Sequence, residues 1–153
     1  MARYFFDTSA FAKFYHPEIG SSRVEAIFLD PASILRISTL TLVETQSAFA
    51  AKVRTGFLDQ TKAEDAMDRV FQDLAGGRVT ALAVSEAQLD SARAQVSKHG
   101  YTRRVRTLDA VQLAGALDLH GKGLLDVFVA ADKLLGEIAL IEGLVVENPE
   151  DSP

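Results

Sequence analysis

Four acidic residues stand where their side chains could act together on a metal ion. Asp7 follows a predicted first strand, and Asp132 follows a predicted fourth strand. Glu44 and Asp109 lie in the predicted first turns of two helices. In open α/β sheets, the carboxyl ends of the strands and the helix starts that follow them share one edge. We therefore expect these residues, called the four acids below, to meet at that edge.

The chemistry of such a cluster follows from its charge. Two unit charges about 4 Å apart interact by roughly 4 kcal/mol at an effective dielectric of 20, so clustered carboxylates repel one another. A divalent cation reverses that balance. Oxygen ligands in a chain without cysteine suit Mg²⁺ or Mn²⁺ better than a structural zinc. An ion held in this way polarises a phosphoryl oxygen and activates water as the nucleophile. We expect Asp7 and Asp109 as central ligands, with Glu44 and Asp132 completing the shell or orienting the water.

Each of the four acids also has a purely structural interpretation. Asp7 and Asp132 could be helix N-caps. Thr41 and Glu44 have the spacing of a capping box, and Asp109 could complement a helix dipole. Helix capping, however, does not require the four residues to lie at the same edge of the sheet. Their expected positions together therefore favour a metal site over capping alone.

Hydroxyl and basic side chains accompany the acids. Thr8 and Ser9 could fix the carboxylate of Asp7, or could cap the first helix. Guanidinium groups upstream of Asp109 could hold a nucleic-acid backbone, or could belong to a solvated loop. The candidate RNA-binding residues are Arg103, Arg104, Arg106 and Lys13.

Segment order predicts the fold class. Strand-like and helix-like segments alternate along the 153 residues, which is typical of a three-layer α/β/α fold with a central, mainly parallel sheet of four to five strands. We expect strands at 3–6, 34–38, 79–83, 126–131 and 144–146. We expect one domain over residues 1–148 and a flexible tail over 149–153.

Composition narrows the classes of function. The formal net charge of -5 argues against binding nucleic acid by bulk charge, although a local basic rim is compatible with it. There is no apolar run of about 20 residues and no signal-peptide pattern, so we expect a cytoplasmic protein without membrane contact. Neither GxxxxGK[ST] nor GxGxxG occurs.

The sequence resembles the PIN-domain family, and within it the VapC-type toxin ribonucleases of bacterial toxin–antitoxin pairs. The likeness covers nearly the whole chain, and its motifs are specific through their order and spacing. The matching stretches are Phe6–Tyr15, Thr41–Glu44, Arg106–Ala114, Phe128–Leu135 and Val145–Pro149.

The resemblance implies a role for each matched residue. The acidic quartet of the family falls on the four acids, and its usual hydroxyl near the first acid falls on Ser9. Asp126, just before the fourth predicted strand, competes with Asp132 for the fourth place; we prefer Asp132 because it follows the strand. The family implies a Mg²⁺- or Mn²⁺-dependent endoribonuclease, a homodimer, and a cognate antitoxin that blocks the site.

Two other functions are compatible with the sequence. The chain could be a catalytically weak module of the same fold that acts through dimerisation and a protein or RNA partner. It could also be a phosphoryl-transfer domain with Asp7 as nucleophile. The second alternative is weakened because Ser9 stands where haloacid-dehalogenase-like enzymes have a second acid.

Overall fold

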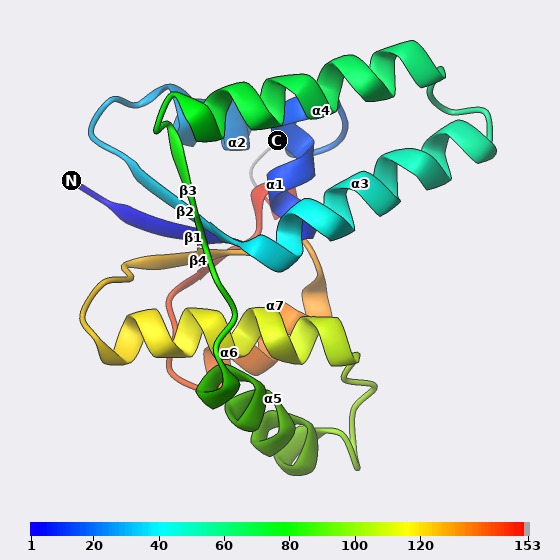
Figure 1. The fold of residues 1–153 in the computed structure, drawn as a ribbon. Helices are drawn as coiled ribbons and strands as arrows, with labels where there is room; N and C mark the ends of the chain where they lie inside the picture. Colours follow the sequence, from blue (N-terminus) through cyan, green and yellow to red (C-terminus); the bar gives the residue numbers. More distant parts are fainter. Residues whose placement is uncertain (152–153) are drawn as a thin grey trace.

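The computed structural model describes residues 1–151 and contains a five-stranded, wholly parallel sheet (Figure 1). Its order is β3-β2-β1-β4-β5. The strands are β1 (Arg3–Phe6), β2 (Ile34–Ser38), β3 (Val79–Leu82), β4 (Val127–Val129) and β5 (Val146–Glu147). The helices are α1 (Thr8–Tyr15), α2 (Ser21–Leu29), α3 (Thr39–Arg54), α4 (Gln60–Ala75), α5 (Glu86–His99), α6 (Thr107–Gly121), α7 (Lys133–Ile141) and the 3₁₀ helix η1 (Pro149–Asp151).

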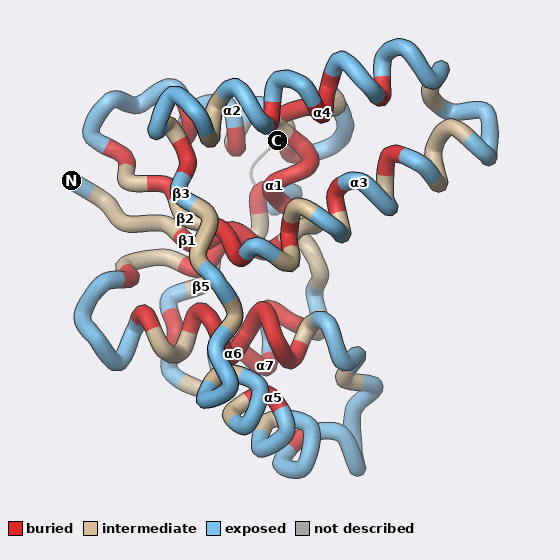
Figure 2. Tube along the Cα trace, in the orientation of Figure 1, coloured by how far each residue is buried: buried red, intermediate tan, exposed pale blue. Residues whose placement is uncertain are grey.

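Helices cover both faces of the sheet. Helices α1 to α4 lie on one face, α6 and α7 lie on the other, and α5 packs on α6 (Figure 1). Adjacent residues of β1 point to opposite faces because side chains alternate along a strand. Phe6 therefore packs in the core beneath α1 and α2, whereas Phe5 packs beneath α6 and α7. The buried residues lie along the sheet and on the helices that cover it (Figure 2). The predicted three-layer α/β/α fold is confirmed.

The order of the strands reverses at β1, which has β2 on one side and β4 on the other. Such a switch point opens a crevice at the carboxyl ends of the strands. The amide of Asp7 donates to the carbonyl of Val129 at 2.9 Å, which joins the ends of the two central strands. On the other face, a Cβ on Gly115 would lie 3.2 Å from Cζ of Phe5, so α6 approaches β1 closely.

Two helix starts test the capping patterns. Ser85 and Gln88 form a capping box at the start of α5. The Thr41–Glu44 box does not form, because α3 begins two residues earlier, with Ser38 as the N-cap that accepts from the amide of Leu40. Glu44 therefore lies in the second turn of α3, and the predicted first-turn position is wrong.

The last elements differ from expectation in their limits. Strand β4 ends at Val129, because the amide of Ala131 donates to the hydroxyl of Ser9 at 3.0 Å and not to a neighbouring strand. Residues 149–151, expected within a flexible tail, form η1 with Pro149 buried. Residues 152 and 153 lie outside the described part. Within residues 1–151, no helix is both long and apolar enough to cross a bilayer.

Candidate active site

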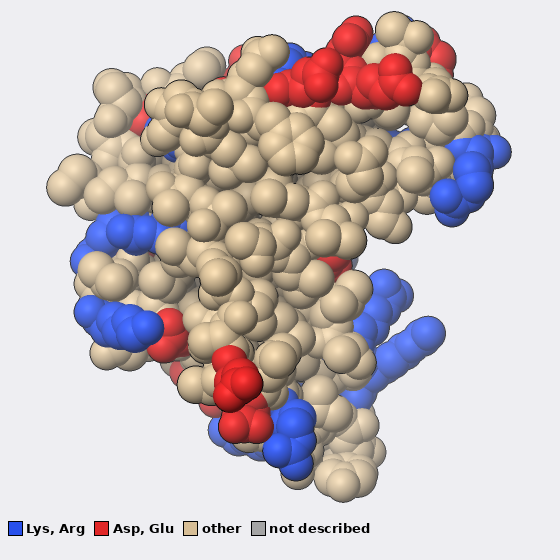
Figure 3. All heavy atoms as spheres, viewed as in Figure 1, with Lys and Arg blue, Asp and Glu red and all other residues tan. Residues whose placement is uncertain are grey.

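The four acids line one cavity of about 520 Å³ at the carboxyl edge of the sheet. They reach it from the ends of β1 and β4 and from helices α3 and α6. Thr8, Ser9 and Arg106 line the same cavity. Figure 3 shows the surface hollowed between the α3–α4 pair and the layer below it, with an acidic group inside and basic groups on the lower rim.

Asp7 is the most deeply buried of the four acids, with 4% of its surface exposed. It is the N-cap of α1, and its Oδ2 accepts from the amide of Ser9 at 3.2 Å and from the hydroxyl of Ser9 at 2.6 Å. The pKa of Asp7 is raised to about 6, with burial as the largest cause. The hydrogen bonds from Ser9 act in the opposite direction, and the charges of Asp109 and Glu44 add to the increase.

Asp109 is the third residue of α6. Burial is the largest cause that raises its pKa to about 6, and the charge of Asp132 is the next. Arg106 acts in the opposite direction, and Glu44 adds to the increase. The charges of Asp132 and Glu44 act on Asp109 through space, so these acids are close enough to destabilise one another's ionised forms.

Glu44 is held through one oxygen. Its Oε1 accepts from the hydroxyl of Thr8 at 2.9 Å and from Nε2 of Gln112 at 2.9 Å. Thr8 begins α1 and Gln112 lies on α6, so two other helices fix this carboxylate of α3.

Asp132 is the N-cap of α7, and its Oδ1 accepts from the amide of Leu135 at 2.9 Å. Asp7 and Asp132 are thus both caps and cavity residues. The structural interpretation and the site interpretation of these two residues are compatible, because capping occupies one carboxylate oxygen and leaves the other.

The donor set fits a divalent cation. Within residues 1–151, the second oxygens of Asp7, Glu44 and Asp132 and both oxygens of Asp109 accept no protein hydrogen bond. None of the four acids forms an ion pair with Lys, Arg or His in that part of the chain. Their negative charge is therefore offset only by the nearby charge of Arg106 and not by a direct ion pair. In the described chain, no three His, Asp or Glu side chains are grouped closely enough to hold an ion, so the four acids would have to draw closer to share one.

Asp126, the competitor for the fourth place, lies at the opposite ends of the strands from the cavity, where the central strands begin. Its carboxylate accepts from Nε and Nη2 of Arg3 at 2.8 and 2.6 Å, and Arg3 holds the pKa of Asp126 well below its usual range. Both residues stand where β1 and β4 begin. This placement leaves Asp132 as the acid at the cavity.

The basic candidates separate into three kinds. Arg106 lines the cavity, whereas Arg103 and Arg104 are exposed on the loop before α6. Lys13 is buried, and its Nζ is bound by Glu18 at 3.2 Å and by Glu150 at 2.8 Å. A buried, paired ammonium group is not presented to RNA, so the structure does not support the proposed contact of Lys13.

Sequence analysis missed Gln112, which touches Glu44, Thr8 and Thr41. A signal was present. Gln112 is the only polar residue in the run Ala110–Leu117 and lies one helical turn after Asp109, on the same side of the helix. A lone amide in an apolar helix run is a candidate for a buried polar contact.

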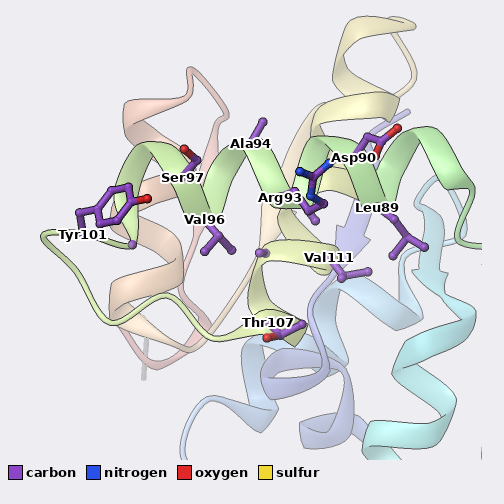
Figure 4. A pocket seen from close by; sticks show the side chains of 12 residues that line it. Leu89, Asp90, Arg93, Ala94, Val96, Ser97, Tyr101, Thr107 and Val111 are labelled. Carbon is purple, nitrogen blue, oxygen red and sulfur yellow. Dashed lines mark ion pairs between the residues drawn. The ribbon is translucent and has the colours of Figure 1, made fainter.

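A larger cavity of about 770 Å³ lies between α5 and α6 (Figure 4). Leu89, Val96, Tyr101 and Val111 are among the side chains around it. None of the four acids lines this cavity. The first turn of α6 separates it from the acidic cavity, since Thr107 faces one and Asp109 the other.

Comparison with solved structures supports the fold. VapC20 of Mycobacterium tuberculosis, described as a sarcin-ricin loop cleaving toxin, is 18% identical with a TM-score of 0.67, over 93% of this chain and 96% of that one. FitAcB from Neisseria gonorrhoeae is 19% identical with a TM-score of 0.62, over 95% and 97%. VapBC-1 from nontypeable Haemophilus influenzae is 19% identical with a TM-score of 0.60, over 96% and 98%.

Sequence comparison gives the family. No curated protein matches the chain significantly. The profile of the PIN domain, in contrast, matches residues 4–139, which include all four acids, β1 from its second residue, and the whole of β2, β3 and β4. The resemblance noted in the sequence is thereby confirmed over most of the chain: this protein belongs to the PIN-domain family.

Proposed function

We propose that the protein is a metal-dependent endoribonuclease that hydrolyses RNA phosphodiester bonds with water. The observation that carries the proposal is the convergence of the four acids, from distant parts of the chain, on one cavity that also contains Arg106. Membership in the PIN-domain family supports it.

In this proposal Asp7 and Asp109 hold Mg²⁺ or Mn²⁺, and Glu44 and Asp132 complete the shell or orient the attacking water. When bound, the ion activates water and stabilises the charge that develops on the phosphate. The protein supplies the geometry. Ser9 orients Asp7, and burial removes competing water from the Asp7 carboxylate.

Arginine side chains account for the contact with RNA. The net charge of -5 means that attraction to a polyanion must be local. Arg106 at the cavity can bind the phosphate that is attacked, while Arg103 and Arg104 can bind its neighbours along the strand. Guanidinium groups suit this task because they bind phosphate oxygens in pairs.

The biological role proposed is that of a cytoplasmic toxin in a toxin–antitoxin pair, acting as a homodimer and blocked by a cognate antitoxin. Support comes from structural neighbours described as toxin–antitoxin proteins, including a toxin–antitoxin complex from Klebsiella pneumoniae. Light scattering on the purified protein measures the dimer. Growth arrest on expression, relieved by a protein that copurifies with the chain, would support the pairing.

RNA cleavage by the purified protein is the direct test. Total cellular RNA is incubated with Mg²⁺ or Mn²⁺, and the cut ends are mapped. Asp109→Asn should reduce cleavage by at least about 100-fold, more than the 10–100-fold typical of outer-shell residues. Asp126→Asn is the matched control, because it removes an acid at the opposite edge, and it should cleave normally. Equal activity of Asp109→Asn and wild type would refute the proposal.

A further inference from the structure

Gln112 is a large polar side chain enclosed in the protein interior, with 1% of its surface exposed. Its Nε2 lies 2.8 Å from Oγ1 of Thr41, 2.9 Å from Oε1 of Glu44 and 3.2 Å from Oγ1 of Thr8. One amide group therefore joins α6 to α3 and to the start of α1, beneath the acidic cavity.

The orientation of this amide follows from its partners. A carboxylate can only accept, so the NH₂ group of Gln112 must face Glu44. Its two hydrogens serve the two short contacts, to Glu44 and Thr41, while the hydroxyl of Thr8 donates its own hydrogen to Oε1 of Glu44 at 2.9 Å. Both donors therefore act on the same oxygen of Glu44.

The arrangement is poorly explained by stability alone. Oε1 of Gln112 is buried and accepts no hydrogen bond in the described chain. An unpaired buried carbonyl of this kind is costly, and an apolar residue of the same shape would avoid that cost. The contact holds the Glu44 carboxylate by Oε1, while Oε2 receives no hydrogen bond from residues 1–151.

On the basis of the proposed function, we infer that Gln112 is a positioning residue for that reaction. It fixes the Glu44 carboxylate through Oε1, so that Oε2 is placed to bind the ion in the acidic cavity. Gln112 itself does not line the cavity, so it would not touch RNA bound there. Its removal should therefore act on the catalytic step and on ion affinity, and should leave RNA affinity unchanged. Outer-shell partners of metal ligands usually contribute 10–100-fold to affinity or activity.

The test uses Gln112→Met, which keeps the length of the side chain and removes the donor. We expect kcat to fall by about 10–100-fold with KM for RNA within about twofold, and Mn²⁺ affinity without RNA to fall by about 10-fold. The same change in a Glu44→Gln background should cause almost no further loss of kcat, because the group that Gln112 positions is already altered. Independent, multiplicative losses in the double variant would overturn the inference.

Gln88→Met is the matched control. Gln88 also binds a carboxylate of α6, with Nε2 3.2 Å from Oδ2 of Asp118, but near the other end of that helix. It should lose thermal stability and keep kcat and Mn²⁺ affinity. If Gln112→Met behaves in the same way, its role is structural and the inference is wrong.

The Mn²⁺ measurement separates the two proposals. A wild-type protein that binds Mn²⁺ and cleaves no RNA would refute the ribonuclease, while the affinity of Gln112→Met would still decide the role of Gln112. Equal Mn²⁺ affinity of the two proteins would overturn that role even if wild type cleaves RNA. A wild type that binds no Mn²⁺ would overturn both.

Discussion

The hydroxyl of Ser9 donates to Oδ2 of Asp7 at 2.6 Å and accepts from the amide of Ala131 at 3.0 Å. One side chain thereby connects the acid at the end of β1 to the backbone that follows β4 and precedes Asp132. The distance between two of the four acids is thus controlled by a residue that need not touch an ion.

Ser9→Ala tests this connection. Hydrogen bonds from Ser9 lower the pKa of Asp7, so their partial loss should raise that pKa and move the acidic limb of the pH–rate profile to higher pH. We expect reduced cleavage at pH 6 to 7 that recovers by pH 9, measured as kcat across that range. Ser9→Thr keeps the hydroxyl and should match wild type. Superimposable profiles for Ser9→Ala and wild type would contradict the assigned role.

Asp7→Asn should stabilise the metal-free protein while it abolishes cleavage. The folded pKa of Asp7, about 6, lies above its ordinary value of 3.8, so the folded state binds the proton more tightly than the unfolded state. Stability therefore falls as pH rises between these two values and stays low above pH 6. An amide avoids that loss, by about 1–3 kcal/mol at pH 8, since one pKa unit corresponds to about 1.4 kcal/mol. Thermal melts in EDTA at pH 5 and pH 8 measure the difference.

The control variant, Asp126→Asn, should change the stability of the protein in the opposite direction. Arg3 lowers the pKa of Asp126, so ionised Asp126 contributes stability above its unfolded pKa. Asp126→Asn should therefore lower the melting temperature at pH 8, where Asp7→Asn raises it. A fall in both variants would mean that the Asp7 carboxylate is stabilising without an ion.

Metal binding should reverse the instability of the acid cluster. An ion that binds only the folded state stabilises it according to its concentration and affinity, by about 2.7 kcal/mol at 100 times Kd. Mn²⁺ should therefore raise the melting temperature of wild type at pH 8 and leave that of Asp109→Asn almost unchanged. EDTA should stop RNA cleavage, and added Mg²⁺ or Mn²⁺ should restore it. Cleavage that resists EDTA would point to chemistry without a metal ion.

Neutralising the loop arginines should weaken RNA binding and flatten its dependence on salt. Each phosphate contact to a single strand adds about 0.7 to the slope of log K against log salt. The triple Gln variant of Arg103, Arg104 and Arg106 should lose up to about 2 of that slope, measured by fluorescence anisotropy at several salt concentrations. Arg93→Gln, at an exposed arginine of α5 beside the other cavity, is the control. An unchanged slope in the triple variant would make the loop a solvated surface.

Much of the fold could be predicted because its signals are local. The aromatic run before Asp7, the β-branched run at Ile34–Ser38 and the apolar helix after Thr107 each carry their own periodicity. Alternation of such segments favours a parallel sheet, and the order β3-β2-β1-β4-β5 then places strand ends together. The start of α3 was misplaced because Thr41 and Glu44 satisfy a local capping rule that the earlier cap, Ser38, overrides.

The sequence by itself determined which acids follow strands or lie near helix starts, and hence which could meet, because the ends of strands and helices are marked by local pattern. Tertiary structure alone decided how they meet. It paired Asp126 with Arg3 at the far edge, buried Lys13, and placed Gln112 against Glu44. These contacts join residues that are far apart in the chain, and their energies depend on burial and distance, which no local sequence pattern encodes.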